Sequence, residues 1–461
     1  MRRLLVTLTI ITSFIWSSPA FAGYSLIQAA TQSASANNQV TDNTTEYINP
    51  GGAIRSLTTE ALRQCPVRTG TGTYDLASVY ISANDVSSAS TLRFRKNTAN
   101  GSQALSITGN TTGFFQEVTN SDSVSAGDVF NWALTVPSVS GTHAVEVKNL
   151  YARFSAASDT YQRLESFLNS ATGGAPSIAS GNTRYHGVGG NLSSFFTTEP
   201  PTQYTYRTGG TIRSLFWQVS SNSANYAITV SVTINGTPVN NVLSITAATT
   251  GLFQDSTNSD SVSVGDLVSV EAVAGTGTGT VDLGGAGIEF QTTNNKSHMY
   301  SQSTEEAVSA AATRYYTLSG GFMHNTANAE DEAVQLRVPF ASTIKNLQIY
   351  LTANAATVLG TFDLRINGAS GTNTISVTAL TTGLFEDTTH TDTIAINDKV
   401  NYRFVVGVGG TSTVSQMGCM IEDTTAAGGT SIKTVNGLAE ASLKTKNGLA
   451  NASTKTFNGL A

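Results

Sequence analysis

One 18-residue segment occurs three times in this chain, and this repetition restricts the fold more than any other feature. Residues 111–128 read TTGFFQEVTNSDSVSAGD, and residues 249–266 read TTGLFQDSTNSDSVSVGD, with 14 of the 18 positions identical. Residues 381–398 read TTGLFEDTTHTDTIAIND and match the second copy at 9 positions. The copies are 138 and 132 residues apart, which is the size of a whole domain and not of a solenoid turn.

Each copy has the residue pattern of β-strands joined by turns. Residues 228–234 alternate Ile and Val with Thr and Ser, which indicates a strand with one face in a core and one in water. The dipeptides Asn235-Gly236 and Asn367-Gly368 follow such strands and favour hairpin turns. The pattern predicts an all-β chain of three tandem antiparallel β-sandwich (jelly-roll-like) domains plus a short repeat tail.

The repeat spacing sets the expected domain boundaries. They are a signal peptide at 1–22, the first repeat at 23–155, the second repeat at 156–292, the third repeat at 293–425 and a tail at 426–461. The linkers are short, so the repeats form either a string or a closed triangle. A string is the prediction, because the repeats show no large exposed apolar patch.

The first 22 residues have the three parts of a secretory signal peptide. Arg2 and Arg3 give a positive start, residues 4–16 are apolar, and Ala20-Phe21-Ala22 fits the cleavage pattern. A run of 13 apolar residues is shorter than the ~20 that a membrane span needs, so no span is expected after signal removal. We therefore expect a secreted protein, extracellular or at the cell surface.

The composition excludes several classes of partner and fold. Charged residues make up only 12% of the chain, and the net charge is −6. Ser, Thr, Asn and Gly replace the missing charges, as in β-proteins with many turns. A negative net charge argues against nucleic acid as a partner, because phosphate binding needs a basic face. Two cysteines, Cys65 and Cys419, lie in predicted strands and are expected to be buried thiols.

The order of elements within a repeat resembles a known family. A strand, an Asn-Gly turn, a spacer, a Gly-Asp turn before a strand and the closing segment GGAGIEF at 284–290 are similar to the later half of tumour-necrosis-factor-like or complement-globular-head jelly rolls. The resemblance implies a sandwich that packs into threefold assemblies around a central axis. The third repeat departs from this pattern, with Asn397 in place of the glycine.

The C-terminal segment has a repeat of its own, with a period of 11 residues. The unit NGLA recurs at Asn436, Asn447 and Asn458. A turn at each Asn-Gly with short strands on either side fits better than a helix, which each Gly would weaken by about 1 kcal/mol. The tail resembles those of uncharacterised bacterial surface and phage-like proteins. It is interpreted as either a solvated end or an assembly tail.

Carboxylates recur in register in the three copies. They are Asp122, Asp260 and Asp392, and Asp128, Asp266 and Asp398. Three copies of one Asp in a turn are better explained as caps on backbone N–H groups than as catalytic groups, and calcium is the alternative. The best single calcium candidate is the cluster Asn328, Glu330, Asp331 and Glu332, with a solvated loop as the other interpretation.

The sequence contains no pattern that indicates an enzyme. The five histidines are scattered, and HExxH, GxSxG and phosphate-loop motifs are absent from the sequence. His390 occupies the position of Asn120 and Asn258 in the other copies, so it is interpreted as a turn residue. Neither a catalytic residue nor a cofactor is therefore expected, apart from the calcium candidate.

Aromatic residues offer the remaining clue to ligands. Trp132 and Trp217, with Tyr204 and Tyr206 near the latter, are candidates for a sugar-binding platform, but both Trp lie in apolar strands and are expected in the core. Equivalent aromatic residues follow the Thr-Thr-Gly turns, and we predict that Phe115, Phe253 and Phe385 are buried, one per repeat.

The function predicted from these features is that of an exported, non-enzymatic structural or adhesive surface protein. Its expected partners are further copies of itself or other surface components. One alternative is a carbohydrate-binding, lectin-like module with glycans as partners. Another is a virion or tail-fibre structural component, which the tail repeats favour and the signal peptide disfavours.

Overall fold

The computed structural model describes most of the chain between residues 24 and 424, together with four short segments of the tail. The described residues are 24–30, 39–54, 56–67, 71–156, 160–167, 176–191, 195–292, 295–320, 330, 332–424, 434–435, 438–439, 445–446 and 449–450. Residues Ala22–Thr425 form one compact unit, separate from the chain termini. The expected signal peptide lies outside the described residues, and no described helix is long and apolar enough to cross a membrane.

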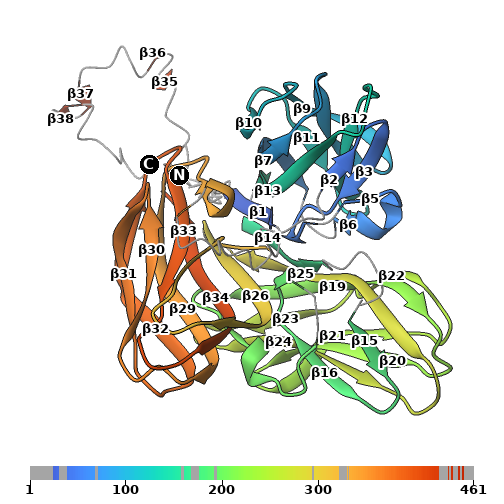
Figure 1. Ribbon diagram of the computed structural model, residues 1–461, viewed down its shortest axis with the longest axis vertical. Helices are drawn as coiled ribbons and strands as arrows, with labels where there is room; N and C mark the ends of the chain where they lie inside the picture. Colours follow the sequence, from blue (N-terminus) through green and yellow to red (C-terminus); the bar gives the residue numbers. More distant parts are fainter. Residues whose placement is uncertain are drawn as a thin grey trace, which may run out of the picture. The chain divides into compact units, whose positions relative to one another are not determined.

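The first repeat folds into two sheets (Figure 1). Its elements are β1 (Tyr24–Ala30), β2 (Gln39–Thr41), β3 (Thr44–Ile48), β4 (Gly52–Ala53), β5 (Ser56–Leu57), the 3₁₀ helix η1 (Glu60–Arg63), β6 (Cys65–Pro66), β7 (Gly72–Asn84), β8 (Ser90–Lys96), β9 (Ala99–Ile107), β10 (Gly113–Glu117), β11 (Asp122–Val124), β12 (Val129–Val136) and β13 (Ala144–Ala156). One sheet has the order β10-β7-β13-β1-β4, with β11 on β7 and β2 on β13. The other has the order β5-β3-β12-β8-β9, with β6 on β12.

The second repeat has the same arrangement. Its elements are β14 (Thr160–Phe167), β15 (Ser177–Ala179), β16 (Thr183–His186), β17 (Gly190–Asn191), the 3₁₀ helix η2 (Pro200–Thr202), β18 (Tyr204–Thr205), β19 (Gly210–Asn222), β20 (Ile228–Ile234), β21 (Thr237–Ile245), β22 (Gly251–Gln254), β23 (Ser259–Val262), β24 (Leu267–Ala274) and β25 (Thr280–Thr292). The sheets have the orders β17-β14-β25-β19-β22, with β15 on β25 and β23 on β19, and β16-β24-β20-β21, with β18 on β24.

The third repeat completes the series. Its elements are β26 (Lys296–Val308), β27 (Thr313–Tyr316), the 3₁₀ helix η3 (Glu332–Val334), β28 (Leu336–Arg337), β29 (Ser342–Asn354), β30 (Gly360–Ile366), β31 (Ala369–Val377), β32 (Gly383–Ile394), β33 (Lys399–Val405) and β34 (Ser412–Asp423). The sheets are β26-β34-β29-β32 and β27-β33-β30-β31, with β28 on β33. The all-β, antiparallel, jelly-roll-like fold is thus confirmed, while the number of domains stays a prediction.

A hydrophobic core lies between the two sheets of each repeat. Trp132 and Trp217 are buried in the cores of the first and second repeats, as expected. The two cysteines are also buried, in separate cores: Cys65 in the first repeat and Cys419 in the third. Sugar binding on the faces of these Trp rings is therefore excluded by their burial.

The Asn-Gly dipeptides form the predicted hairpin turns. Asn235 and Gly236 join β20 to β21 with φ values of 54° and 79°, a conformation that these two residues adopt at low cost. The strand before this turn differs from the expectation of one face in water. Ser231 and Thr233 are buried, and the Thr233 hydroxyl donates to Glu199, which immediately precedes η2.

The aromatic residues after the Thr-Thr-Gly turns are equivalent but not fully buried. Phe115, Phe253 and Phe385 pair with equivalent positions of β7, β19 and β29. Each ring is only half-buried and packs against the edge of the core of its own repeat. The predicted full burial was wrong because these residues lie on β10, β22 and the start of β32, at the edge of the sheet.

The structure describes two short strand pairs in the tail. Strand β35 (Thr434–Val435) pairs with β36 (Leu438–Ala439), and β37 (Thr445–Lys446) pairs with β38 (Leu449–Ala450), both antiparallel. The Asn-Gly dipeptides at 436–437 and 447–448 lie outside the described residues, so the turns expected there stay a prediction. The third NGLA unit lies outside the described residues.

Candidate functional site

Each repeat places one aromatic ring in the hydrophobic core of a neighbouring repeat. Tyr151 of the first repeat lies in the core of the third, Tyr300 of the third in that of the second, and Phe216 of the second in that of the first. The exposed fractions of the three side chains are 1%, 1% and 4%. The contacts therefore run from first to third, third to second and second to first, and they close on themselves.

This closed set of contacts corrects the predicted string of repeats. A string requires contacts between consecutive repeats only, whereas Tyr151 packs against the third repeat and Asn149 donates a hydrogen bond to its Gln335 carbonyl. The string was predicted because no large apolar patch was evident in the sequence. That reasoning failed because the apolar side chains that join the repeats lie within ordinary strands, where they cannot be distinguished from core residues.

The rings of the first and third repeats occupy equivalent places but come from different strands. In the first repeat Gln28 on β1 pairs with Tyr151 on β13. In the third repeat the equivalent pair is Tyr300 on β26 and Gly418 on β34. A Cβ atom on Gly418 would lie 2.4 Å from the Tyr300 ring, so the glycine makes room for a ring that the neighbouring strand supplies.

The second repeat supplies its ring from a third strand. Phe216 on β19 lies opposite Gly287 on β25, where a Cβ atom would lie 2.6 Å from the Phe216 ring. Gly287 is equivalent to Tyr151 and Gly418. In each repeat one large aromatic side chain therefore fills the same space, and a neighbouring strand carries a smaller or more flexible residue.

One hydrogen bond between repeats has an equivalent at a second contact. Asn149 donates to the Gln335 carbonyl at 3.0 Å, and Gln416 donates to the Gln203 carbonyl at 2.6 Å. The two donors are equivalent in strand register, and the two acceptors directly follow η3 and η2. The equivalent position in the second repeat is Gly285, which has no side chain to donate, so the contact between second and first repeats lacks this bond.

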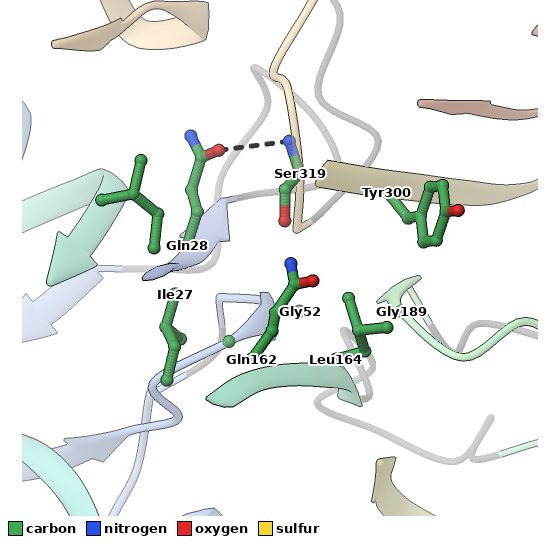
Figure 2. A pocket seen from close by; sticks show the side chains of 10 residues that line it. Ile27, Gln28, Gly52, Gln162, Leu164, Gly189, Tyr300 and Ser319 are labelled. Carbon is green, nitrogen blue, oxygen red and sulfur yellow. Dashed lines mark hydrogen bonds between the residues drawn. The ribbon is translucent and has the colours of Figure 1, made fainter. Parts of the chain in front are cut away.

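The first strands of the three repeats meet around a small hollow (Figure 2). Its lining includes Ile27, Gln28 and Gly52 of the first repeat, Gln162, Leu164 and Gly189 of the second, and Tyr300 and Ser319 of the third. The Ser319 amide donates to Gln28 Oε1 at 3.1 Å, the dashed line in Figure 2. The His298 amide donates to Gln162 Oε1 at 2.6 Å. The described lining thus consists of amide, peptide and apolar groups, and Tyr300 is the one titratable side chain among these described residues.

Two glycines allow the backbones of different repeats to approach closely. A Cβ atom on Gly190 would lie 2.4 Å from the Gln302 amide nitrogen, and Gly190 has a φ of +111°. A Cβ atom on Gly320, at a φ of +86°, would lie 2.9 Å from backbone atoms of Gln28, Ala30 and Gly52. Gly190 and Gly320 belong to glycine pairs that recur in the three repeats, at 51–52, 189–190 and 320–321. These two glycines are therefore points where one repeat contacts another.

The contact between second and third repeats is rich in aromatic groups. The Tyr204 and Tyr300 rings stack at 3.9 Å, and the Tyr300 hydroxyl donates to the Thr205 carbonyl at 2.9 Å. The Arg207 amide donates to His298 Nε2 at 3.2 Å. Burial raises the pKa of Tyr300 well above its usual value and lowers the pKa of His298 to about 3, so both groups are neutral at pH 7.

The recurring Asp residues cap backbone N–H groups, as the sequence predicts. Asp260 accepts from the amides of Asn240 and Asn241 at 3.0 and 2.8 Å. Asp266 accepts from the Ser263 amide and the Asn235 side chain at 2.7 and 2.8 Å. The equivalent residues, Asp122 and Asp128 in the first repeat and Asp392 and Asp398 in the third, accept equivalent bonds.

The structure describes two members of the calcium candidate, Glu330 and Glu332. Glu330 forms an ion pair with Arg365 at 3.0 Å, and Glu332 forms one with Lys399. Asn328 and Asp331 lie outside the described residues. In the part of the chain that is described, no group of three or more His, Cys, Asp or Glu side chains is arranged to hold a metal ion. A calcium site here stays a prediction.

The described histidines have separate structural surroundings. His186 is buried and donates from Nδ1 to the Gly187 carbonyl, while its Nε2 accepts from the Trp217 indole at 3.2 Å. Burial lowers the pKa of His186 to about 4. His390 is exposed, with Nδ1 at 2.8 Å from Asp387, but it lies on β32 and not in the predicted turn. The strand continues through this position because its register against β29 shifts between Asp387 and Thr391. His324 lies outside the described residues.

The residues that join the repeats were missed in the sequence because they differ between copies. Tyr151, Phe216 and Tyr300 occupy three different alignment positions, so the repeat pattern does not reveal them. Tyr204 and Tyr206 were considered only as sugar-binding candidates, and the structure buries both where the second and third repeats meet. The paired glycines were the one signal that could have located these contacts.

Comparisons with known proteins give only distant similarities. No family model matches the chain, and no curated protein matches it. One solved structure, described as the triple jelly roll fold and turret assembly in an archaeal virus, is 12% identical, with 86% of this chain and 91% of that chain covered and a TM-score of 0.15. The VP2 subviral particle of infectious bursal disease virus is 8% identical, with coverages of 88% and 83% and a TM-score of 0.18. Similarity at this level does not establish what this chain binds or assembles with.

Proposed function

We propose that this chain is a non-enzymatic structural protein, a building block in which three jelly-roll domains are held together as one body. The observation that carries this proposal is the exchange of one aromatic ring from each repeat into the core of the next. Tyr151, Phe216 and Tyr300 are buried and make each core depend on a neighbouring repeat. Burial of this kind rigidifies an assembly unit and is not needed in a flexible chain of binding modules.

The surroundings of the titratable groups support a structural function. Among the described histidines, His186 and His298 are buried, neutral and hydrogen-bonded within the cores and contacts. The recurring carboxylates are occupied by backbone N–H groups, which holds turns in place. In these positions the carboxylates and histidines hold turns and contacts in place, which supports the structural proposal.

The proposed partner is a second copy of this chain or another component of the same assembly, and we retain export as the proposed location. A structural component of a virus-like particle is the second candidate. The observation that favours it is the closed set of contacts, because three similar jelly rolls in one chain present nearly equivalent outer surfaces to surrounding subunits, as a trimer would.

Sedimentation velocity and negative-stain electron microscopy of residues 23–461 test the proposal. We expect ordered oligomers, fibres or shells that grow with protein concentration. The Tyr300→Ala variant should lose these assemblies at a temperature where its circular dichroism spectrum still shows β-structure. A wild-type chain that remains monomeric at every concentration and salt condition would overturn the structural proposal.

A further inference from the structure

The first repeat has a polar hollow on its surface, and in the other two repeats longer side chains fill the equivalent position. It has a volume of about 400 Å³ and lies on the sheet that contains β3, β8 and β12. Its lining includes Thr45, Thr91, Arg93, Arg95, Ala133 and Thr135. Arg93 and Arg95 are two positions apart on β8, so both side chains belong to the same face of the sheet.

Comparison of the repeats shows why the hollow exists. Arg93 pairs across the strands with Ala133. In the third repeat the equivalent pair is Asp363 and Arg403, which form an ion pair with a shortest distance of 2.7 Å. The first repeat thus retains an arginine in this pair but has a methyl group where a longer side chain would cover it.

The second repeat fills the same place with a carboxylate. Ser231 there pairs with Glu271, which accepts a hydrogen bond from Tyr185 at 3.1 Å. In the first repeat, Ala133 takes the position of Glu271. Among the three cross-strand pairs, only the one in the first repeat combines a cation with no anion.

The two arginines of the hollow differ in their partners. Arg95 forms two hydrogen bonds of 3.0 Å with the Glu60 carboxylate and one of 2.6 Å with Asn100. The described contact of the Arg93 guanidinium is a 3.4 Å hydrogen bond to the Gly101 carbonyl, and no described acidic side chain pairs with it. Arg93 therefore presents most of its donors, while Arg95 is fixed as part of the wall.

We propose that this hollow binds an acidic sugar through its anionic group. The Arg93 guanidinium offers a planar fork that matches a carboxylate or sulfate, and the hydroxyls of Thr45, Thr91 and Thr135 can exchange hydrogen bonds with sugar hydroxyls. The volume is in the range of small-ligand pockets and fits one sugar ring. This site goes beyond the structural function and does not depend on assembly.

Isothermal titration calorimetry of residues 23–461 with glucuronate, glucose 6-sulfate and glucose tests this site. We expect saturable binding of one or both charged sugars at one site per chain and no binding of glucose. Binding of glucuronate alone would assign a carboxylate ligand, and binding of glucose 6-sulfate alone would assign a sulfate ligand. Failure of both charged sugars to bind would overturn the proposal.

Variants that copy residues of the other repeats separate the site from the fold. Arg93→Ser, which installs the residue found in the second repeat, should weaken binding about 10- to 100-fold. Ala133→Glu should abolish binding while leaving the melting temperature unchanged or raised, because the new carboxylate can pair with Arg93.

A matched pair of threonine variants completes the test. Thr91→Val should weaken binding, whereas Thr361→Val, at the equivalent position of the third repeat, should leave it unchanged. If Arg93→Ser and Ala133→Glu bind as the wild type does, any observed binding lies elsewhere and the proposed site is wrong. Since these readouts are binding to the purified chain, their failure would not affect the structural proposal.

Discussion

Two contacts between repeats use equivalent backbone positions but different side chains. One joins the third repeat to the second, and the other joins the first repeat to the third. Gln28 and Tyr300 are equivalent residues on β1 and β26, and both lie in these contacts. Tyr300 supplies its own ring, whereas next to Gln28 the ring comes from Tyr151 on the adjacent strand. The comparison teaches that the filled volume, and not the residue at one position, is what the repeats share.

The largest expected effect is the difference in unfolding free energy between removing the Tyr300 ring and removing the Gln28 amide at the equivalent position. Tyr300→Ala should lower the free energy of unfolding by about 3–5 kcal/mol, because it removes a buried ring from the core of another repeat. Gln28→Ala should cost about 1–3 kcal/mol, from the loss of its hydrogen bonds to Ser319 and Asn149. Urea unfolding followed by circular dichroism measures both.

The ring in the first repeat provides the matched control. Tyr151→Ala should cost as much as Tyr300→Ala, within the scatter of cavity effects. The contrary result would be an equal loss of stability for Gln28→Ala and Tyr300→Ala, with little loss for Tyr151→Ala. Stability would then depend on the alignment position and not on the volume that the rings fill. Because three repeats are coupled, the transitions should be compared at the same denaturant concentrations and not extrapolated as two-state values.

The next effect tests close backbone approach. Gly190→Ala places a Cβ atom 2.4 Å from the Gln302 amide nitrogen, while Gly251→Ala meets no atom within 4 Å. The two glycines have φ values of +111° and +108°, so each alanine variant should have the same backbone strain of about 1–3 kcal/mol. Gly190→Ala should therefore cost about 1–3 kcal/mol more in thermal or urea unfolding. Equal costs for the two variants would contradict the close approach between the second and third repeats.

The next effect is a loss of stability in acid. His298, in the contact between the second and third repeats, should contribute more to this loss than His186, because its pKa is lowered further. Burial lowers the pKa of His298 to about 3, so the unfolded chain binds a proton more readily than the folded one. The stability from this neutral histidine is present above about pH 6.5 and is lost as the pH falls toward the folded pKa. Melting temperatures should therefore decline between pH 6.5 and 4.5.

Variants at the two buried histidines assign this pH dependence. His298→Gln should flatten the profile, even if the variant is less stable at pH 7. His186, whose pKa burial lowers to about 4, contributes with the same sign, so His186→Gln should flatten the remaining slope. Burial raises the pKa of Glu306 to about 7, which acts with the opposite sign over this pH range. Slopes of the two histidine variants that equal the wild-type slope would therefore contradict the burial of both histidines.

Much of the fold could be predicted from local sequence, whereas the contacts between repeats could not. The turn at Asn235-Gly236 and the capping Asp residues are short-range features, and both were confirmed. The alternation in residues 228–234 predicted the strand but not the burial of Ser231 and Thr233. The string arrangement was wrong because contacts such as that of Tyr151 join residues far apart in the chain. A buried tyrosine in a strand gives the same pattern whether it packs within its own repeat or against another.

The candidate sites likewise depend on contacts between residues that are far apart in the sequence. The acidic cluster at 328–332 suggested calcium because its residues are adjacent in sequence, but Glu330 is paired with Arg365, which comes from a strand 35 residues further along the chain. The hollow beside Arg93 was invisible in the sequence, since it arises from the residue across the strands being alanine. Contacts between residues far apart in the chain, which sequence alone does not provide, decide both cases.

The smallest expected effect concerns the ion pair between Arg207 of the second repeat and Glu386 of the third. Arg207→Ala should cost less than about 1 kcal/mol, because both side chains remain partly exposed and the attraction is screened. The backbone contact survives the substitution, since it is the Arg207 amide that donates to His298. A double-mutant cycle with Glu386→Ala should give a small coupling energy that falls further when salt is raised from about 0.1 M to 1 M. A coupling as large as the effect of Tyr300→Ala would mean that charge, and not the buried ring, holds these two repeats together.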